Sequence, residues 1–378
     1  MLNDDLGSLR RRHFREKRAQ LEPFLRTPLL LYWGKWEGPN MRALALVEEF
    51  TRPTFLLCEP GGKSVAVSQA IETDAWTDLA GDMELVPYKT GADLKAVLVE
   101  RLRRYVEVAA EVSTEAFAFD RLPPAYYEFL STRVRVVSAD AILIPWRGVK
   151  TPSELRLMKA AADATFRLFD YVGGMARPGV PEAEIQRFLI EGALALGTGN
   201  AFPPIVAAGP RSTNPHPQRR SDNVIKNGDR VIVDFGVDYL GYKADITRTY
   251  IAGGKAEDDP YFDISVKLQE FVKSADLTQR TPASLGAACA EIVRDAGLSD
   301  REKHGYGHGL GVETHDPHPY IAAVASPWTE KPFADGMVFT FEPGFYDDTG
   351  GFRIEEDYVV WQGRAVPIQK FEPPAVKK

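Results

Sequence analysis

Four of the six histidines in this sequence lie within one short segment of the chain. They are His304, His308, His315 and His318, and several glycines are interspersed among them. Glycine disfavours a helix and lets the backbone approach a site closely. The segment therefore predicts a tightly packed site with imidazole groups, although His318, which lies between two prolines, is interpreted as a loop residue.

Two aspartates lie on predicted neighbouring strands, over residues 231–237 and 242–251. If Tyr239 and Leu240 form the connecting loop, Asp234 lies directly opposite Asp245, with Cβ atoms about 5 Å apart. Two buried carboxylates at that distance repel each other, so a shared proton or a divalent cation must neutralise them. Tyr-Leu is unfavourable in a type I′ turn, so a bulge could shift this register.

Two glutamates lie on a second pair of predicted strands joined by a glycine-containing connection. Glu342 precedes a Pro-Gly pair, and Glu355 ends an Arg-Ile-Glu sequence. Taken singly, such motifs usually indicate a turn, a strand edge or surface charge. Together with His308, the four carboxylates form an oxygen-rich ligand set. This set favours a pair of Mn²⁺-like ions over a structural zinc, which prefers cysteine and histidine.

The order and neighbours of these five residues resemble the metal ligands of the pita-bread metallopeptidases, over roughly residues 148–362. That family contains the Xaa-Pro aminopeptidases (aminopeptidase P), the Xaa-Pro dipeptidases (prolidases) and the methionine aminopeptidases. A preceding domain of the size found here is typical of the proline-specific, creatinase-like branch. The resemblance therefore implies metal-dependent hydrolysis of the bond between an N-terminal residue and proline.

The resemblance also implies a role for each metal ligand. Asp234 would bind one ion through both oxygens, and Asp245 and Glu355 would bridge the two ions. His308 and Glu342 would complete the second ion. The two ions, expected to be Mn²⁺ with Co²⁺ or Zn²⁺ as alternatives, would hold a water or hydroxide as the nucleophile. Glu342 would accept a proton as that water attacks.

Four further residues match positions beside the metal site of that family. His216, in an Asn-Pro-His-Pro sequence, matches a substrate-side histidine, and His304 matches a histidine near the proline. His315 would stabilise the oxyanion. Arg353 would join the hydrogen bonds that hold the metal carboxylates. Such a site suits an Xaa-Pro bond, which is a tertiary amide without an N–H group.

The C-terminal part of the chain, residues 149–378, must position these side chains. A helix is predicted from Pro152, with Thr151 as its N-cap and Glu154 completing a capping box. Further helices are predicted over 181–196, 261–277 and 282–296, and strands over 231–237, 242–251, 337–341 and 352–360. Helices segregated from antiparallel strands predict an α+β domain, and the resemblance implies the pita-bread fold.

The N-terminal part, residues 1–148, predicts a smaller α/β domain, which the resemblance identifies as creatinase-like. Its first 26 residues predict a basic helix with a solvated face. A second helix is expected over 94–112. Short apolar runs predict strands at 29–33, 54–57, 64–67, 116–119, 134–137 and 142–144. In that family such a domain, often from a partner subunit, helps to limit substrate length, and a homodimer is the expected assembly.

Composition excludes several classes of protein. The chain has 378 residues, a hydrophobic fraction of 44% and a net charge of −7. These values argue against a coiled coil, a disordered chain and a nucleic-acid-binding protein. No window is apolar enough for a membrane helix, and the N-terminus lacks the apolar segment of a signal peptide. Cys58 and Cys289 are expected to be reduced, which favours a cytoplasmic location.

Two alternatives to an Xaa-Pro peptidase remain open at this point. One is a hydrolase or lyase that acts on a small non-peptide substrate with the same dinuclear site. The other is a catalytically silent binding protein of the same fold. The complete ligand set disfavours the second, and a peptide assay separates the first.

Overall fold

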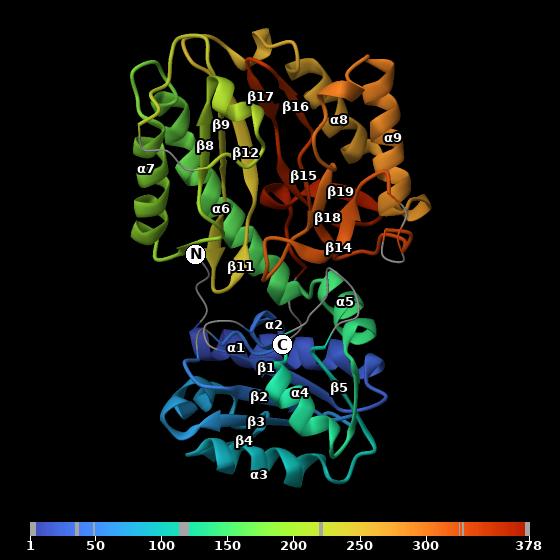
Figure 1. Cartoon of the computed structure of the whole chain (residues 1–378). Helices are drawn as coiled ribbons and strands as arrows, with labels where there is room; N and C mark the ends of the chain where they lie inside the picture. The colour runs from blue at the N-terminus through green and yellow to red at the C-terminus, as the bar shows by residue number, and fades with distance from the viewer. Residues whose placement is uncertain are drawn as a thin grey trace. The chain divides into compact units, whose positions relative to one another are not determined.

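The computed structural model divides into two compact units, residues 1–147 and 148–378 (Figure 1). The structure describes residues 5–34, 38–47, 50–112, 121–218, 222–324, 326 and 329–374. The strand predicted over 116–119 lies outside these residues. Within them, no helix is both long enough and apolar enough to cross a membrane.

The N-terminal unit is built on one mixed six-stranded sheet in the order β4-β3-β2-β1-β5-β6. The strands are β1 (Leu29–Trp33), β2 (Thr54–Cys58), β3 (Ser64–Gln69), β4 (Glu84–Tyr88), β5 (Glu107–Ala110) and β6 (Arg135–Ser138). The helices are α1 (Leu6–Leu21), α2 (Pro39–Ala45), α3 (Gly91–Leu102), α4 (Pro124–Ser131) and α5 (Asp140–Gly148). Every residue of β1 and β2 is buried, which is typical of strands covered on both faces.

Two predictions for this unit were wrong. The apolar run at 142–144 is part of helix α5 and not a strand. A short buried run has no periodicity that distinguishes a helix from a strand, so the prediction of a strand failed here. The helix predicted over 94–112 ends at Leu102, and β5 begins at Glu107. A turn at residues 103–104 separates them, and β-branched Val108 fits a strand.

The basic helix α1 is packed into the unit, contrary to the predicted solvated face. Four of its basic side chains are buried: Arg10, His13, Lys17 and Arg18. The Nε2 atom of His13 lies 2.8 Å from the carbonyl oxygen of Ala43 in α2. Long basic side chains can bury their methylene stems while the polar head reaches an acceptor, so charge alone did not define the exposed face.

Lys17 gives a testable consequence of this packing. Its Nζ donates to the carbonyl oxygen of Trp146 at 3.2 Å and lies 4.2 Å from the centre of the Trp146 ring. We expect Lys17→Met to lower the free energy of unfolding by about 1–3 kcal/mol, because the carbonyl loses a charged donor. Urea unfolding measures this. Arg103→Ala, on an exposed side chain, serves as the control and should leave the midpoint unchanged.

Within the part that the structure describes, the C-terminal unit has four sheets and four long helices. The helices are α6 (Pro152–Met175), α7 (Glu182–Ala195), α8 (Phe262–Ser274) and α9 (Pro282–Asp295). The capping box predicted at Thr151 and Glu154 is present. One core joins α6 and α7 to the strands β8, β9 and β12, and another joins α8 and α9 to β15, β17 and β18. Strands therefore occupy the interior between two helical pairs, and α7 and α9 lie at opposite sides of the unit (Figure 1).

The first half of this unit contains β7 (Gly199–Asn200), β8 (Ile205–Ala208), β9 (Arg230–Phe235), β10 (Val237–Tyr239), β11 (Tyr242–Lys243) and β12 (Ile246–Ile251). The second contains β13 (Gly307–Gly309), β14 (Asp316–Ile321), β15 (Val338–Phe341), β16 (Gly344–Asp347), β17 (Gly350–Arg353), β18 (Glu356–Trp361) and β19 (Arg364–Pro367). This arrangement is the α+β pita-bread fold that was predicted. His318 belongs to β14 and is buried, so its prediction as a loop residue was wrong.

Candidate functional site

The predicted site residues line one cavity of about 770 Å³ in the C-terminal unit. Its walls contain all nine candidates: Asp234, Asp245, His216, His304, His308, His315, Glu342, Arg353 and Glu355. Three lie within strands, three lie in the short gaps between strands, and three lie in loops: Asp234, His308 and Arg353; Asp245, Glu342 and Glu355; and His216, His304 and His315. The fold therefore brings together residues that are spread over 140 positions of the sequence, from 216 to 355.

The hairpin that carries the two aspartates has a different register from the one predicted. Its turn is Leu240-Gly241, whose φ values are 52° and 87°, so glycine occupies one of the two left-handed positions. Asp234 consequently lies opposite Thr247 and not opposite Asp245. The shift is two residues, and side chains two residues apart share a face of the sheet. Both carboxylates therefore still point to the same side.

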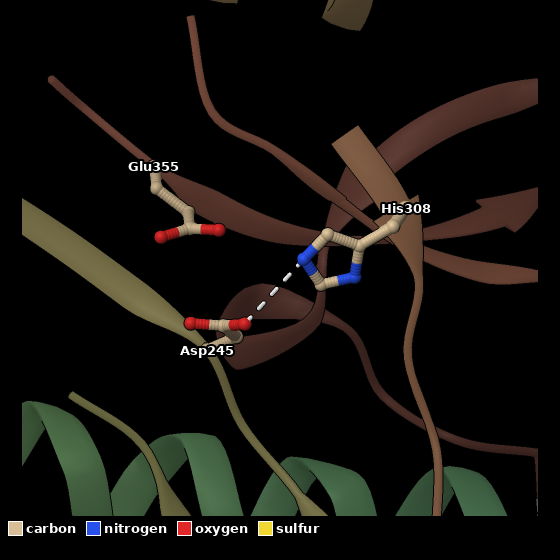
Figure 2. Close-up of side chains that lie close together, drawn as sticks. All are labelled: Asp245, His308 and Glu355. Atoms are coloured by element: carbon tan, nitrogen blue, oxygen red, sulfur yellow. Dashed lines mark ion pairs between the residues drawn. The ribbon is translucent and has the colours of Figure 1, made fainter. Parts of the chain in front are cut away.

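Three ligand groups lie closest together. One atom from each of Asp245, His308 and Glu355 falls within 4.8 Å of the others, and all three residues are buried (Figure 2). The Nε2 atom of His308 is 3.7 Å from Asp245 Oδ2 and also 3.7 Å from Glu342 Oε1. Together with Glu342 they form a buried cluster of three carboxylates and one imidazole. Buried carboxylates this close together need a neutralising partner.

The carboxylates of this cluster are strained electrostatically. Burial, and then the negative charge of Glu355 and Asp234, raise the pKa of Asp245 well above its ordinary value. Burial and the charge of Glu342 do the same to the pKa of Glu355. Asp234 Oδ1 is buried and has no hydrogen-bond partner among the described residues. A hard divalent cation would neutralise Asp245 and Glu355 and would give Asp234 Oδ1 a partner. The donor set therefore fits such an ion.

His308 is in the form that a metal ligand needs. Burial lowers its pKa to about 3, so the ring is neutral. Nδ1 lies 3.0 Å from the carbonyl oxygen of Gly309, and a carbonyl only accepts, so Nδ1 carries the proton. Nε2 is left with its lone pair directed at the carboxylates. This is the usual way in which a protein fixes the tautomer of a ligating histidine.

Arg353 ties two of the carboxylates together. Its guanidinium donates to Asp234 Oδ2 at 2.7 Å and to Thr247 Oγ1 at 3.2 Å. Thr247 Oγ1 in turn donates to Glu355 Oε2 at 2.6 Å. The arginine is buried, and its charge partly offsets the burial that raises the pKa of Asp234. Thr247 was not predicted, although its position two residues after Asp245 on the same strand could have indicated it.

The model of metallopeptidase family M24 matches residues 156–362, which is more than half of the chain. This chain belongs to metallopeptidase family M24. The matched span contains the entire cavity wall described above.

Relatives of this M24 chain bear the names of dipeptidases and aminopeptidases. It is 30% identical to a putative Xaa-Pro aminopeptidase of Mycoplasma genitalium over 61% of this chain and 64% of that protein. It is 29% identical to the probable dipeptidase PepE of Mycobacterium tuberculosis over 85% and 84%. The match therefore spans less than two thirds of the length of the first of these relatives.

Solved structures resemble the whole chain. The dipeptidase PepE from Mycobacterium ulcerans has a TM-score of 0.80 and 26% identity, and 98% of each chain is covered. The Xaa-Pro dipeptidase from Bacillus anthracis has a TM-score of 0.81 and 24% identity, over 96% of this chain and 99% of that one. This second likeness establishes the fold alone.

Tyr346 is a residue of the M24 site that was not predicted. Its hydroxyl accepts a hydrogen bond from Arg353 at 2.9 Å and donates to His304 Nε2 at 2.8 Å. The other ring nitrogen, Nδ1, lies 2.8 Å from the carbonyl of Gly305 and so donates to it. Burial lowers the pKa of His304 to about 4. Burial therefore keeps His304 neutral, and the hydrogen bonds to Tyr346 and to the Gly305 carbonyl fix its tautomer.

We expect Tyr346→Phe to lower kcat/KM for peptide hydrolysis by about 10–100-fold. This is the usual range for a residue that orients the residues of a metal site through hydrogen bonds. The variant leaves a guanidinium N–H and an imidazole nitrogen without their shared partner. Steady-state kinetics with saturating metal measures the loss. A variant with unchanged kcat/KM would show that this contact has no part in turnover.

His216 and His315 lie in the wall of the same cavity. The rings of His315 and His308 have centroids 4.1 Å apart, so His315 lies directly beside the candidate metal ligand. Burial, and then the charge of His216, lower the pKa of His315. The backbone of His216 is fixed by Asn214, whose Oδ1 accepts from its N–H at 3.0 Å. Both imidazoles can therefore present a polar group to a ligand in the cavity.

Proposed function

We propose that this protein hydrolyses the Xaa-Pro peptide bond and releases the residue that precedes proline, as a metal-dependent aminopeptidase or dipeptidase. The observation that carries the proposal is the buried group of Asp245, His308 and Glu355 in the wall of a large cavity. Membership of family M24 supports it, as do the names of the relatives.

The proposed metal ligands are Asp234, Asp245, His308, Glu342 and Glu355. The unsatisfied Oδ1 of Asp234 and the raised pKa values of Asp245 and Glu355 support this assignment. The proposed group is a pair of divalent ions, with Mn²⁺ as the native metal and Co²⁺ or Zn²⁺ as substitutes. Such ions act as Lewis acids that polarise a carbonyl and lower the pKa of water.

Glu342 is the proposed proton carrier. Burial raises the pKa of its carboxyl to about 7, so the group exchanges protons readily near neutral pH. Its Oε2 lies 3.8 Å from His304 Nδ1, and its Oε1 faces His308. From this position Glu342 can accept a proton during attack on the peptide carbonyl and pass it to the leaving proline nitrogen.

The remaining histidines are proposed to hold the substrate. His315 would donate to the carbonyl oxygen of the scissile bond as negative charge develops there. His216 would also contact the substrate, and His304 would lie beside the proline. Arg353 would keep Asp234 in place and so preserve the geometry of the site.

The cavity wall supports an apolar substrate residue. Phe202, Pro203 and Ile205 lie along one side, and Pro215 and Pro217 flank His216. A proline ring has no N–H to satisfy and buries apolar surface, so it suits a wall of this composition. The candidate metal ligands lie in the same wall and would face the reacting carbonyl.

The proposal is tested with a matched pair of peptides, Xaa-Pro and Xaa-Pro-Yaa. Protein stripped of metal and then reloaded with Mn²⁺ is assayed for release of the N-terminal residue, with the stripped sample as control. Cleavage of the dipeptide alone defines a prolidase, and cleavage of the longer peptide defines an aminopeptidase. If neither is cleaved by protein that binds two ions, the peptidase proposal fails, and a small non-peptide substrate replaces it.

We also propose the surroundings in which the enzyme works. The N-terminal residues 1–148 would form a creatinase-like domain that limits the length of the peptide, and the chain would act as a homodimer. Cys58 and Cys289 are buried and free, which supports a reducing compartment such as the cytoplasm. Sedimentation analysis tests the dimer, and cell fractionation tests the location.

A further inference from the structure

The two glutamates of the site lie where a strand ladder is interrupted. β15 pairs with β18 up to Phe341 and Glu356, and β16 pairs with β17 from Gly344 and Arg353 onward. The register is the same on both sides of this gap, so it places Glu342 opposite Glu355. Two carboxylates that face each other across a gap repel, and the gap lacks the ladder hydrogen bonds that would hold the strands together.

One side chain from outside the sheet spans this gap. Gln269 of α8 is buried, and its Nε2 donates to the carbonyl oxygen of Phe341 at 3.0 Å and to that of Ile354 at 2.9 Å. Phe341 immediately precedes Glu342, and Ile354 immediately precedes Glu355. A single amide group therefore ties together the backbones that carry the two glutamates.

The orientation of this amide is fixed by chemistry. Both backbone partners are carbonyls, which only accept, so the NH₂ group must face them. The remaining atom, Oε1, accepts from the hydroxyl of Tyr358 at 2.7 Å. Three of the four hydrogen-bonding positions of Gln269 are thus occupied, and two of them belong to the strands of the site. A side chain with fewer than two N–H donors could not donate to both carbonyls.

We propose that Gln269 is a positioning residue that sets the separation of Glu342 and Glu355 and thereby the affinity of the site for its metal ions. The inference rests on the proposed metal centre. Without the amide, the two backbones lose this link at the gap, and the two glutamates are no longer held at one separation before an ion binds. The ion must then supply the free energy that draws the strands together, so its affinity falls.

The test measures Mn²⁺ binding by titration calorimetry on full-length, metal-stripped protein. Gln269→Met keeps the length and bulk of the side chain but donates no hydrogen bond. We expect its Kd for Mn²⁺ to rise by about 10–100-fold relative to the wild type. The increase in Tm on adding Mn²⁺ should shrink in parallel, because stabilisation by a ligand depends on its Kd.

Ser265→Ala is the matched control. Ser265 is buried one turn earlier on α8. Its hydroxyl donates to the carbonyl of Tyr261, which lies four residues earlier in the chain and not on the strands of the site. Its loss should lower the Tm of the metal-free protein without changing the Kd for Mn²⁺. A merely structural role for Gln269 predicts this same pattern, so a folded Gln269→Met variant with wild-type Kd would overturn the inference.

A second variant decides the matter if Gln269→Met does not fold. Tyr358→Phe keeps the amide and removes only the hydroxyl that orients it. A severalfold rise in Kd supports the inference, and an unchanged Kd overturns it. Wild-type protein that binds Mn²⁺ but cleaves no Xaa-Pro peptide would refute the proposed function alone. Wild-type protein that binds no divalent ion would refute both proposals.

Discussion

Replacing Asp245 with alanine should abolish peptide hydrolysis, with a loss in kcat of more than about 100-fold, beyond the range for residues that only orient ligands. Asp245 is central to the cluster because its Oδ2 faces His308 and its carboxyl is within reach of Glu355. Its main chain is also fixed, since its N–H donates to Asp357 Oδ2 at 3.0 Å. Its removal therefore takes a shared ligand from the proposed centre.

The Asp245→Ala measurement needs both kinetics and metal analysis. Initial rates on an Xaa-Pro peptide are compared with bound Mn²⁺ per chain, and circular dichroism confirms that the variant is folded. Asp238→Ala is the control, because Asp238 lies in the same hairpin and pairs with Lys243 outside the cavity wall. An Asp245→Ala variant that retained full metal-dependent activity would show that the assignment of the site is wrong.

The two aspartates illustrate how far sequence reasoning could go. The predicted register was wrong by two residues, because the turn forms at Leu240-Gly241 and not at Tyr239-Leu240. The conclusion that the two carboxylates share a face survived, because the side-chain period of a strand is two residues. Chemistry that depends on a shared face can therefore be predicted more securely than the pairing that produces it.

Two residues that support the site were beyond the reach of the sequence. Tyr346 contacts two site residues and Gln269 contacts the backbone next to two others, but each is an ordinary polar residue in its own segment. Gln269 lies on a helix whose other buried residues are mostly apolar, and only the three-dimensional fold brings it to the strand gap. Long-range hydrogen bonds of this kind leave no periodic signal along the chain.

The N-terminal unit shows a different limit. Its sheet strands were predicted closely where apolar runs are short and bounded by turns, as at 29–33 and 64–67. Burial of Lys17 and Arg18 could not be predicted from charge, because their acceptors are backbone carbonyls of other elements. A hydropathy scale depends only on the side chain itself. The burial of these two side chains depends on the carbonyl acceptors that they reach.

The metal-free protein should lose stability as the pH rises from 6.5 to 8. Asp245, Glu355 and Asp357 all have pKa values raised well above their ordinary values, mainly by burial. The folded chain therefore holds protons that the unfolded chain releases above about pH 4. Each such proton lowers the free energy of unfolding by about 1.4 kcal/mol per pH unit until the folded group ionises.

The histidines act in the opposite direction but in a lower pH range. Burial lowers the pKa of His304 to about 4 and that of His308 to about 3, so both are neutral in the fold. Unfolded histidine takes up a proton below about pH 6.5. Their contribution to stability is therefore present above that pH and is lost as the pH falls toward their folded values. At pH 6.5 unfolded histidine is still about half protonated, so the histidines add a small further rise in stability above that pH, which the larger decline from the carboxylates outweighs.

Urea unfolding at pH 6.5, 7.2 and 8.0 on metal-stripped protein measures the decline, and the same series with saturating Mn²⁺ should be flatter because cations favour ionised carboxylates. Asp357→Asn is the informative variant. Its amide oxygen can still accept from the Asp245 N–H, but the side chain cannot titrate, so the decline should be smaller. If metal-free wild type were equally stable at pH 6.5 and 8.0, the buried carboxyls would not retain protons. The repulsion assigned to this cluster, and with it the need for a cation, would then be wrong.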